Sequence, residues 1–323
     1  MSAETGFLIA CPRSGTTWLQ RAMSAHPDAV CVERRLFGRH ADIVHDLASD
    51  RPRLRATLDA YVHALCGHLT PGGAWLNNAA GRDALLIDIA EAMAHRVRTW
   101  AGKRFVIDKI TPYDGTSATV VGRIASLWPD APVAHMVRDG RDVAVSGVMN
   151  GLTRLNGREG PAHARRRAWL LEGDASAALE RFFLPGEVAH WARLWLEPTA
   201  ALREGIASGA VHVVRYESML ADAPGSLRAL LRFYGLETDA EVADACANAA
   251  TFERLSGGRR RGEADASSPV RSGVAGDWMR WMTREDGEAF ERIAGGQLRE
   301  LGYVSDPDWW KELPERLAEP AGV

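Results

Sequence analysis

Long hydrophobic runs and an excess of charge of either sign are both missing from this sequence. None of its apolar stretches approaches the roughly 20 residues that a transmembrane helix needs. The 39 Lys and Arg residues nearly balance the 42 Asp and Glu residues, for a formal net charge of −3. No global positive field is therefore present to attract nucleic acid or an anionic membrane. We expect neither a membrane span nor a nucleic-acid partner, and any anion site must be a local concentration of basic side chains.

Cysteine is scarce as well. The four cysteines lie far apart, without the C-x-x-C or Cys/His spacing of a zinc site: Cys11, Cys31, Cys66 and Cys246. We interpret them as reduced core thiols and expect no metal. The first apolar run begins at Phe7, which leaves no room for a signal peptide. These features together predict a cytoplasmic protein.

What the chain does contain is an alternation of short apolar runs and helical segments. The runs that predict buried strands are 7–10, 29–32, 104–109, 133–137 and 211–217. Strands alternating with helices predict an α/β fold, a single doubly wound parallel sheet. Two helical excursions without a convincing strand, about 36–102 and 150–206, are expected to shape the pocket of a second substrate. Because no linker or repeat interrupts the pattern, we expect one domain over residues 1–323.

The first strand leads into a loop that is suited to phosphate. Residues 7–10 are apolar, residues 12–15 favour a tight turn, and a helix is expected from Thr16. Strand, glycine-containing turn and helix together point backbone N–H groups and the positive end of a helix dipole at an anion. Arg13 adds a charged fork, and Ser14, Thr16 and Thr17 add hydroxyl donors. The sequence therefore predicts a P-loop-like phosphate site here.

This loop departs from a Walker A loop at one informative position. Gly15 and Thr17 fit the pattern, but its first glycine falls on Ala10 and its lysine on Thr16. The cation that reaches the β- and γ-phosphates of a nucleoside triphosphate is thus missing. A P-loop kinase or NTPase is still an alternative, with Asp108 at the end of a strand holding Mg²⁺. A noncatalytic nucleotide-binding module is a further alternative.

The stretch Pro-Arg-Ser-Gly-Thr-Thr-Trp at residues 12–18 resembles the 5′-phosphosulfate loop of sulfotransferases that use 3′-phosphoadenosine 5′-phosphosulfate (PAPS). The resemblance implies that PAPS is the co-substrate and that no metal is required. Residues Arg13, Ser14, Gly15, Thr16 and Thr17 would hold the 5′-phosphosulfate. Trp18 would lie beside the adenine.

Two further stretches resemble the part of these enzymes that binds the ribose 3′-phosphate. Arg138 and Ser146 stand eight residues apart, where the family has the Arg and Ser that grip this phosphate. Residues 271–278, Arg-Ser-Gly-Val-Ala-Gly-Asp-Trp, are similar to its R-x-G-x-x-G-D-W segment. Arg271, Ser272 and Gly273 would thus contact the same phosphate. The family often has Lys where Ser272 stands, so one charge is lost.

The resemblance also implies residues for the adenine. Thr251-Phe252 is similar to the family's Thr-Ser-Phe segment, whose Phe packs on the base, an interaction worth about 1–3 kcal/mol. Tyr216 resembles its Tyr near the adenine. A buried core Phe and a Tyr bonded to the backbone are the alternatives for these two residues.

The reaction that the resemblance implies is in-line sulfuryl transfer to a hydroxylated small-molecule acceptor. Arg13 would stabilise the leaving phosphate oxygen, and Lys109 would approach the sulfuryl group. The stretch 108–112 has no His, unlike the phenol and steroid enzymes. It resembles instead the branches, several of them bacterial, that use a Glu after the second strand, where Glu33 stands. His40 is the second candidate for the base, and Glu33 could simply pair with Arg34 or Arg35.

Overall fold

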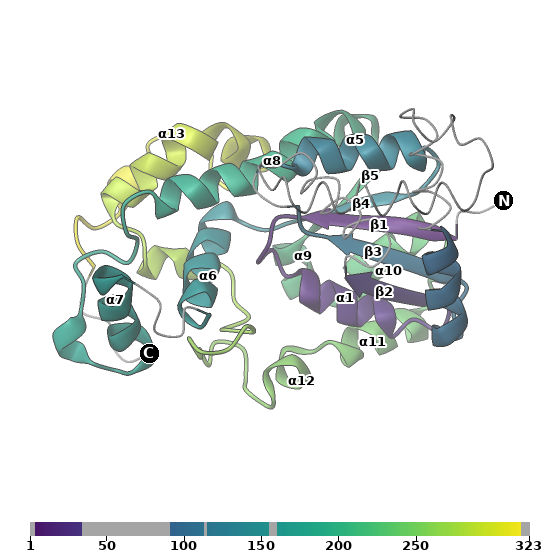
Figure 1. Ribbon diagram of the computed structural model, residues 1–323, viewed down its shortest axis with the longest axis horizontal. Coiled ribbons are helices and arrows are strands. Elements are labelled where there is room, and N and C mark those ends of the chain that lie inside the picture. The colour runs from purple at the N-terminus through teal and green to yellow at the C-terminus, as the bar shows by residue number, and fades with distance from the viewer. Residues whose placement is uncertain (1–3, 34–90, 113–114, 155–159, 318–323) are drawn as a thin grey trace, which may run out of the picture.

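The computed structural model describes residues 4–33, 91–112, 115–154 and 160–317 (Figure 1). Its centre is a sheet of five strands in the order β2-β3-β1-β4-β5. The strands are β1 (Thr5–Ala10), β2 (Ala29–Glu33), β3 (Phe105–Ile110), β4 (Val133–Val137) and β5 (Val211–Arg215). All neighbouring strands are parallel, which confirms the predicted α/β fold.

Helices alternate with the strands, and the first helix begins at Thr16 as predicted. Those that belong to the sheet layers are α1 (Thr16–Ser24), α5 (Ser117–Leu127), α8 (Glu187–Ser208), α9 (Tyr216–Ala221), α10 (Ala223–Phe233) and α11 (Ala240–Ala249). The others are α6 (Gly140–Leu152), α7 (Pro161–Leu171), α12 (Phe252–Ser256) and α13 (Arg284–Glu300), with short 3₁₀ turns at η2 (Ala175–Ala177), η3 (Asp277–Arg280) and η4 (Trp309–Glu312). A further helix covers residues 91–101. None of the described helices combines the length and apolarity that crossing a bilayer requires.

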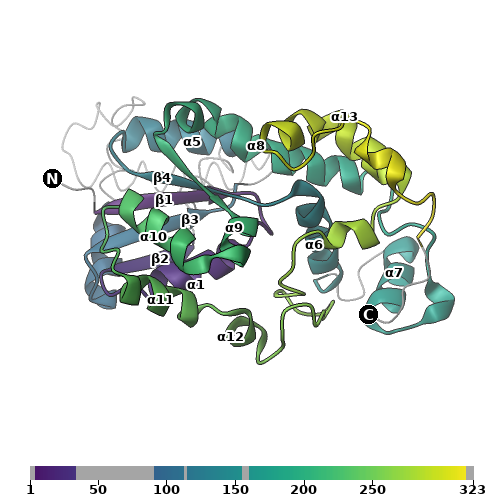
Figure 2. The same ribbon diagram turned by 180° about the vertical axis from the view of Figure 1, so that it is seen from behind.

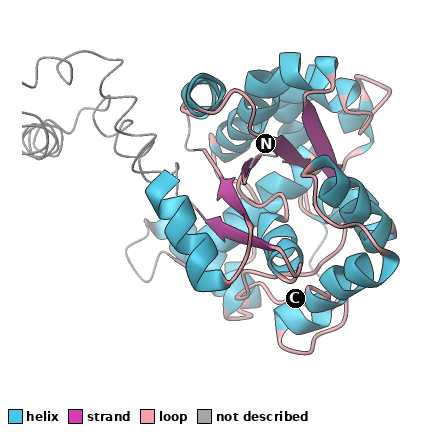
Figure 3. Ribbon diagram, turned by 90° about the vertical axis from the view of Figure 1, so that its right-hand side faces the viewer, coloured by secondary structure: helices cyan, strands magenta, loops and turns pink. Residues whose placement is uncertain are grey.

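Side-chain alternation along β1 explains why helices cover both faces of the sheet. Phe7 and Ile9 point to one face, where they pack with residues of α5 and α8. Leu8 and Ala10 point to the other face, toward α1, α10 and α11. Figures 1 and 2 show these two helical layers from front and back, and Figure 3 shows them on either side of the strands. The continuous apolar run of β1 is thus the signature of a strand buried on both sides.

The strand order places the functional crevice beside β1. The chain runs from β1 out to β2 and back to β3, then crosses to β4 on the other side of β1. In an open parallel sheet, ligands bind at the carboxyl ends of the strands where the order reverses. The loop after β1 and the start of α6 after β4 therefore meet at this position.

A second apolar core lies outside the sheet. It joins α6, α7, α8 and α13 through large aromatic residues, among them Trp169, Trp195, Trp281, Phe182 and Phe290. In Figure 1, α6, α7 and much of α13 lie to the side toward which β1 and β4 run. The predicted excursion over 150–206 contains α7 and most of α8, joined by a segment with the short turn η2. Most of the excursion over 36–102, including His40 and Cys66, lies outside the described residues, as do Arg34 and Arg35.

One predicted strand is too long. The run 211–217 ends as a strand at Arg215, because Tyr216 already begins α9. The side chain of Glu217 accepts hydrogen bonds from the backbone N–H of Asp139, at 3.0 Å, and from the Tyr303 hydroxyl, at 3.0 Å. Helical backbone here directs Glu217 to the turn between β4 and α6, a tertiary contact that the apolar pattern does not report.

Candidate active site

The loop after β1 has an unusual backbone conformation. Arg13 has a φ of 72°, the one positive φ of a non-glycine residue among the described residues. Gly15 follows with a φ of 94°, and a Cβ there would lie 2.6 Å from Cδ2 of Tyr216. Glycine is therefore required at position 15 for its conformation and for its close packing. A strained residue such as Arg13 persists where the surrounding structure holds it, and such residues cluster at functional sites.

Helix α1 begins directly after this loop. Its N-cap is Gly15, and the first bond of the helix runs from the Leu19 N–H to the Gly15 carbonyl, at 3.2 Å. The N–H groups of the first turn, from Thr16 to Trp18, thus have no partner within the helix. Ser14 Oγ is buried and has no hydrogen-bond partner among the described residues. Unmet donors at a helix N-terminus are the elements of an anion site.

The guanidinium group of Arg13 in this loop is joined by two others from distant parts of the chain, those of Arg138 and Arg271. Arg13 donates from Nε to Ser146 Oγ, at 3.2 Å, and from an Nη to the Pro269 carbonyl, at 2.6 Å. Arg138 donates to the Val274 carbonyl, at 3.0 Å, and Arg271 pairs with Asp277. Arg138 and Arg271 are 7% and 8% exposed, and the Nε of each lacks a partner among the described residues.

The electrostatics of the cluster indicate an anionic ligand. Burial, together with the nearby charges of Arg138, Arg154 and Arg271, lowers the pKa of Arg13 to about 10. Positive groups that disfavour one another's charge are stabilised by a bound anion between them. The site therefore favours a ligand with more than one negative charge.

Two buried carboxylates hold the segments that carry these cations. Asp142 on α6 accepts from the N–H groups of Gly276, at 2.8 Å, and Trp278, at 3.0 Å. Its Oδ2 also lies 3.7 Å from Arg138 Nη2. Burial raises the pKa of Asp142, while Arg138 acts in the opposite direction. Asp277 binds Arg271 and the indole N–H of Trp281, so these aspartates position the cations.

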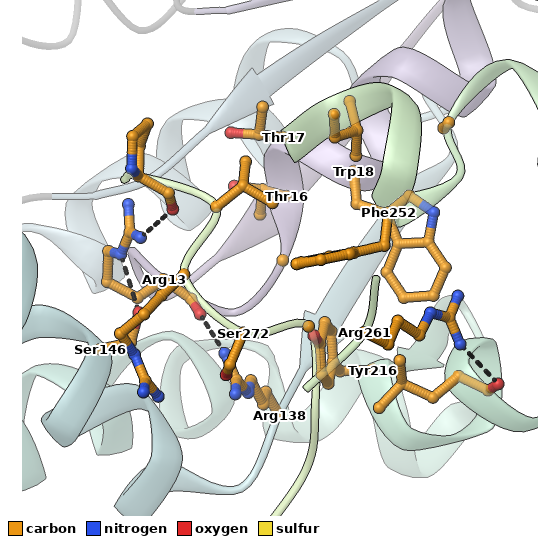
Figure 4. Close-up of a pocket in the computed structure, with 18 residues that line it drawn as sticks. Arg13, Thr16, Thr17, Trp18, Arg138, Ser146, Tyr216, Phe252, Arg261 and Ser272 are labelled. Carbon is orange, nitrogen blue, oxygen red and sulfur yellow. Dashed lines mark hydrogen bonds between the residues drawn. The ribbon is translucent and has the colours of Figure 1, made fainter. Parts of the chain in front are cut away.

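Aromatic side chains line the pocket away from Arg13 (Figure 4). Trp18 packs edge-on against Tyr216, with ring centroids 5.6 Å apart. The guanidinium carbon of Arg138 lies 4.3 Å from the centre of the Tyr216 ring. Phe252, at the start of α12, completes this end of the pocket. Figure 4 shows Arg13 at one end, Trp18 and Phe252 toward the other, and Arg138 between them.

Most of the predicted nucleotide-binding residues line this one pocket. They are Arg13, Gly15, Thr16, Thr17, Trp18, Arg138, Ser146, Tyr216, Phe252, Arg271, Ser272 and Gly273. Ser14 lies buried behind the lining, and Thr251 caps α12 by accepting a hydrogen bond from the Arg254 N–H, at 3.4 Å. Asp277 and Trp278 take part in structural contacts instead.

Glu33 and Lys109 form a separate pair on the other side of the loop. Glu33 ends β2 and lies opposite Lys109 in β3 in the strand register. Lys109 Nζ is 3.3 Å from Glu33 Oε2, with the Lys109 side chain 2% exposed and that of Glu33 53% exposed. The pair thus presents an accessible carboxylate and a buried ammonium at the same sheet edge as the phosphate loop.

Sequence reasoning missed several residues of the site. Leu220 and Arg261 line the pocket, and Arg154, directly after α6, is close enough to influence the Arg13 charge. The basic run 259–261 was a visible signal for Arg261. Leu220 and Arg154 had no such signal, because only the tertiary arrangement brings them here.

The sheet order, the loop after β1 and the cationic pocket define an α/β protein with a P-loop-like anion site. A family model described as "Sulfotransferase family" matches residues 7–240, and the chain belongs to this family. The predicted family is thereby confirmed.

Named relatives agree with this membership. The chain is 27% identical over 310 residues to the nodulation protein NoeE of Sinorhizobium fredii (strain NBRC 101917 / NGR234), covering 92% of this chain and 65% of that protein. This chain thus spans about two thirds of the length of that relative. Mouse sulfotransferase SULT7A1, complexed with PAP (adenosine 3′,5′-bisphosphate), is 16% identical to this chain. Its structure matches with a TM-score of 0.51, over 94% of this chain and 90% of that one. The sulfotransferase domain from the curacin biosynthetic pathway is 14% identical to this chain, with a TM-score of 0.50. The match covers 95% of this chain and 99% of that domain. The two structures show a shared fold.

Proposed function

We propose that this protein transfers a sulfuryl group from PAPS to a hydroxyl group of a small-molecule acceptor. The observation that carries the proposal is a cation cluster, the half-buried Arg13 with the buried Arg138 and Arg271, at one aromatic-lined pocket. A 3′-phosphorylated adenosine 5′-phosphosulfate has two separated anionic groups and a flat base. Its chemistry matches two anion-binding subsites with an aromatic end.

The two anion subsites differ in their donors. The 5′ subsite consists of Arg13, the hydroxyls of Ser14, Thr16 and Thr17, and the free N–H groups of the first turn of α1. The 3′ subsite consists of Arg138, Ser146 and the segment 271–273. Arg13 donates to Ser146, so the subsites adjoin. Each offers the charge-assisted donors that phosphate oxygens prefer.

The order of the strands supports the assignment of roles along the sheet edge. Glu33 and Lys109 lie at the carboxyl ends of β2 and β3, and the phosphate loop and Arg138 directly follow β1 and β4. These four strands are neighbours in the order β2, β3, β1, β4. Adjacent strands lie about 4.8 Å apart, so the four groups form a row. The acceptor would bind at the Glu33 end, the sulfuryl group near Lys109, and the 3′-phosphate at the Arg138 end.

The reaction proposed for this row is an in-line displacement. Glu33 accepts the proton of the acceptor hydroxyl, whose oxygen forms a bond to sulfur as the bond from sulfur to the 5′-phosphate oxygen breaks. Negative charge then develops on the phosphate oxygen, where Arg13 and the N–H groups of α1 stabilise it. Lys109 donates to the sulfuryl oxygens. The products are the sulfated acceptor and adenosine 3′,5′-bisphosphate (PAP), the compound in the mouse structure of similar fold.

The alternative is phosphoryl transfer from a nucleoside triphosphate with Mg²⁺ bound at Asp108. Asp108 is fully buried in β3, and the phosphate loop has Thr16 where a Walker lysine would stand.

The cytoplasmic location and the single domain over residues 1–323 also stay predictions.

A screen of hydroxylated acceptors with sulfur-labelled PAPS, carried out in EDTA, tests the proposal. We expect label transfer to at least one acceptor, with no dependence on added Mg²⁺, and no transfer from γ-labelled ATP. Transfer from ATP that EDTA abolishes would contradict the proposal and support the kinase alternative.

A further inference from the structure

Two arginines of the basic run after α12 lie against the two aromatic walls of the pocket. The guanidinium carbon of Arg259 is 5.5 Å from the centre of the Phe252 ring. That of Arg261 is 5.5 Å from the Trp18 ring. Arg260, between them, is exposed and does not line the pocket. The alternation places the first and third arginine beside the pocket and the second one away from it.

Arg259 has a structural role. Its guanidinium donates to the carbonyl groups of Glu263, Val270 and Arg271, at 2.8, 2.5 and 2.6 Å. It thus fastens the loop that carries the 3′ subsite and supports the outer side of Phe252. Gly273 packs closely on the same ring, since a Cβ there would lie 2.3 Å from Phe252 Cδ2. These contacts fix Phe252 in place.

Arg261 is different because most of its donors are unused. Among the described residues its guanidinium makes one hydrogen bond, to the Leu220 carbonyl at 3.3 Å. A guanidinium has five N–H groups, so the remaining donors are free for a ligand. Figure 4 places Arg261 beside Trp18 and Tyr216, at the end of the pocket opposite Arg13. Its charge also acts on Tyr216, in the direction that lowers the pKa of this phenol, against the dominant effect of burial.

We propose that Arg261 binds the nucleobase directly, donating to ring nitrogens of the adenine while its cation lies over Trp18. The proposal rests on the proposed function, since it concerns the nucleotide bound in that same pocket. Arginine only donates hydrogen bonds, and the unsubstituted ring nitrogens of adenine only accept them. The faces of Trp18 and Phe252 can stack on the base but supply no cationic hydrogen-bond donor to its edge. Arg261 supplies this missing polar contact.

The test compares two ligands and two variants by calorimetry. The ligands are PAP and an abasic ribose 3,5-bisphosphate, which has both phosphates and no base. Arg261→Ala should weaken the affinity for PAP by about tenfold, the usual scale of one charge-assisted or cation–π contact. The affinity for the abasic ligand should stay unchanged. Arg260→Ala removes the same charge one residue away and should change neither affinity.

Each other outcome would overturn the proposal. Equal weakening of both ligands by Arg261→Ala would mean that Arg261 acts through its charge on the phosphates. Unchanged PAP affinity would mean that it makes no contact with the base. If the unmodified protein fails to bind PAP at all, the proposed function fails and this inference falls with it. That result is distinguishable because it appears before any variant is compared.

Discussion

Replacement of Glu33 by glutamine separates the proposed proton acceptor from the structure around it. Glu33 Oε2 lies 3.3 Å from Nζ of Lys109, and Glu33 is half-exposed while Lys109 is buried. A glutamine amide keeps an oxygen to which the Lys109 ammonium can donate. It cannot accept the proton of an acceptor hydroxyl. The substitution thus removes the chemistry and keeps the hydrogen bond.

The expected size of the effect follows from these contacts. Loss of a general base lowers turnover by about 10²–10⁴, or about 3–5 kcal/mol in the activation free energy. The free energy of unfolding should fall by only about 1 kcal/mol, because an ion pair with one solvated partner contributes little. PAP affinity should hold, since Glu33 does not line the nucleotide pocket. Glu33→Ala, which also removes the oxygen, should destabilise the fold further by leaving Lys109 buried without its described partner.

The assay is kcat/KM as a function of pH, with a sulfated product as the readout. Glu33→Gln should lower kcat/KM by about 10²–10⁴ across the pH range in which the unmodified protein is active. His40→Asn is the paired variant and should cost far less. If Glu33→Gln keeps full activity and His40→Asn removes it, the reasoning about Glu33 is wrong and the carboxylate only pairs with a basic neighbour.

Three further predictions concern the nucleotide site and the core. Arg138→Ala should weaken the affinity for PAP by about 10–100-fold in calorimetry, the scale of a lost charged hydrogen bond, and barely change the affinity for AMP. An equal loss of affinity for both nucleotides would contradict the assignment of Arg138 to the 3′ subsite. Gly15→Ala should lower the free energy of unfolding in urea by about 1–3 kcal/mol, because position 15 has a φ of 94° and a Cβ would meet Tyr216; an unchanged midpoint would contradict this. Burial lowers the pKa of His135 from 6.5 to about 4, so the unfolded chain binds this proton first as pH falls. The stability present above pH 6.5 should thus decrease toward pH 4 by about 3 kcal/mol, and His135→Gln should flatten this decrease in urea titrations, whereas the exposed His95→Gln should not.

The three central strands β1, β3 and β4 were predictable because they are buried on both faces. A continuous apolar run such as Phe7–Ala10 has no polar alternation to obscure it, and all five runs became neighbouring parallel strands. The end of β5 was mispredicted because Tyr216 is apolar enough to continue a strand. The contacts of Glu217 with Asp139 and Tyr303, which are distant in sequence, accompany the change to a helix there.

The site was predictable where its residues are close together in sequence. Arg13 to Trp18 form one loop and helix start, and the pair Arg138 and Ser146 spans one turn and helix. The strand order was not readable from the sequence, so neither was the adjacency of Glu33 and Lys109, which depends on β2 pairing with β3. Leu220 and Arg154 enter the site only through tertiary packing.

The most direct test of the central claim compares the affinity of the unmodified protein for three adenine nucleotides: PAP, AMP and ATP. If the cluster of Arg138, Ser146 and Arg271 binds a ribose 3′-phosphate, PAP should bind most tightly. At a hundredfold excess over its Kd, PAP should stabilise the fold by about 2–3 kcal/mol, whereas equal concentrations of AMP and ATP should do much less. Equal stabilisation by all three nucleotides would contradict the assignment of a PAPS site.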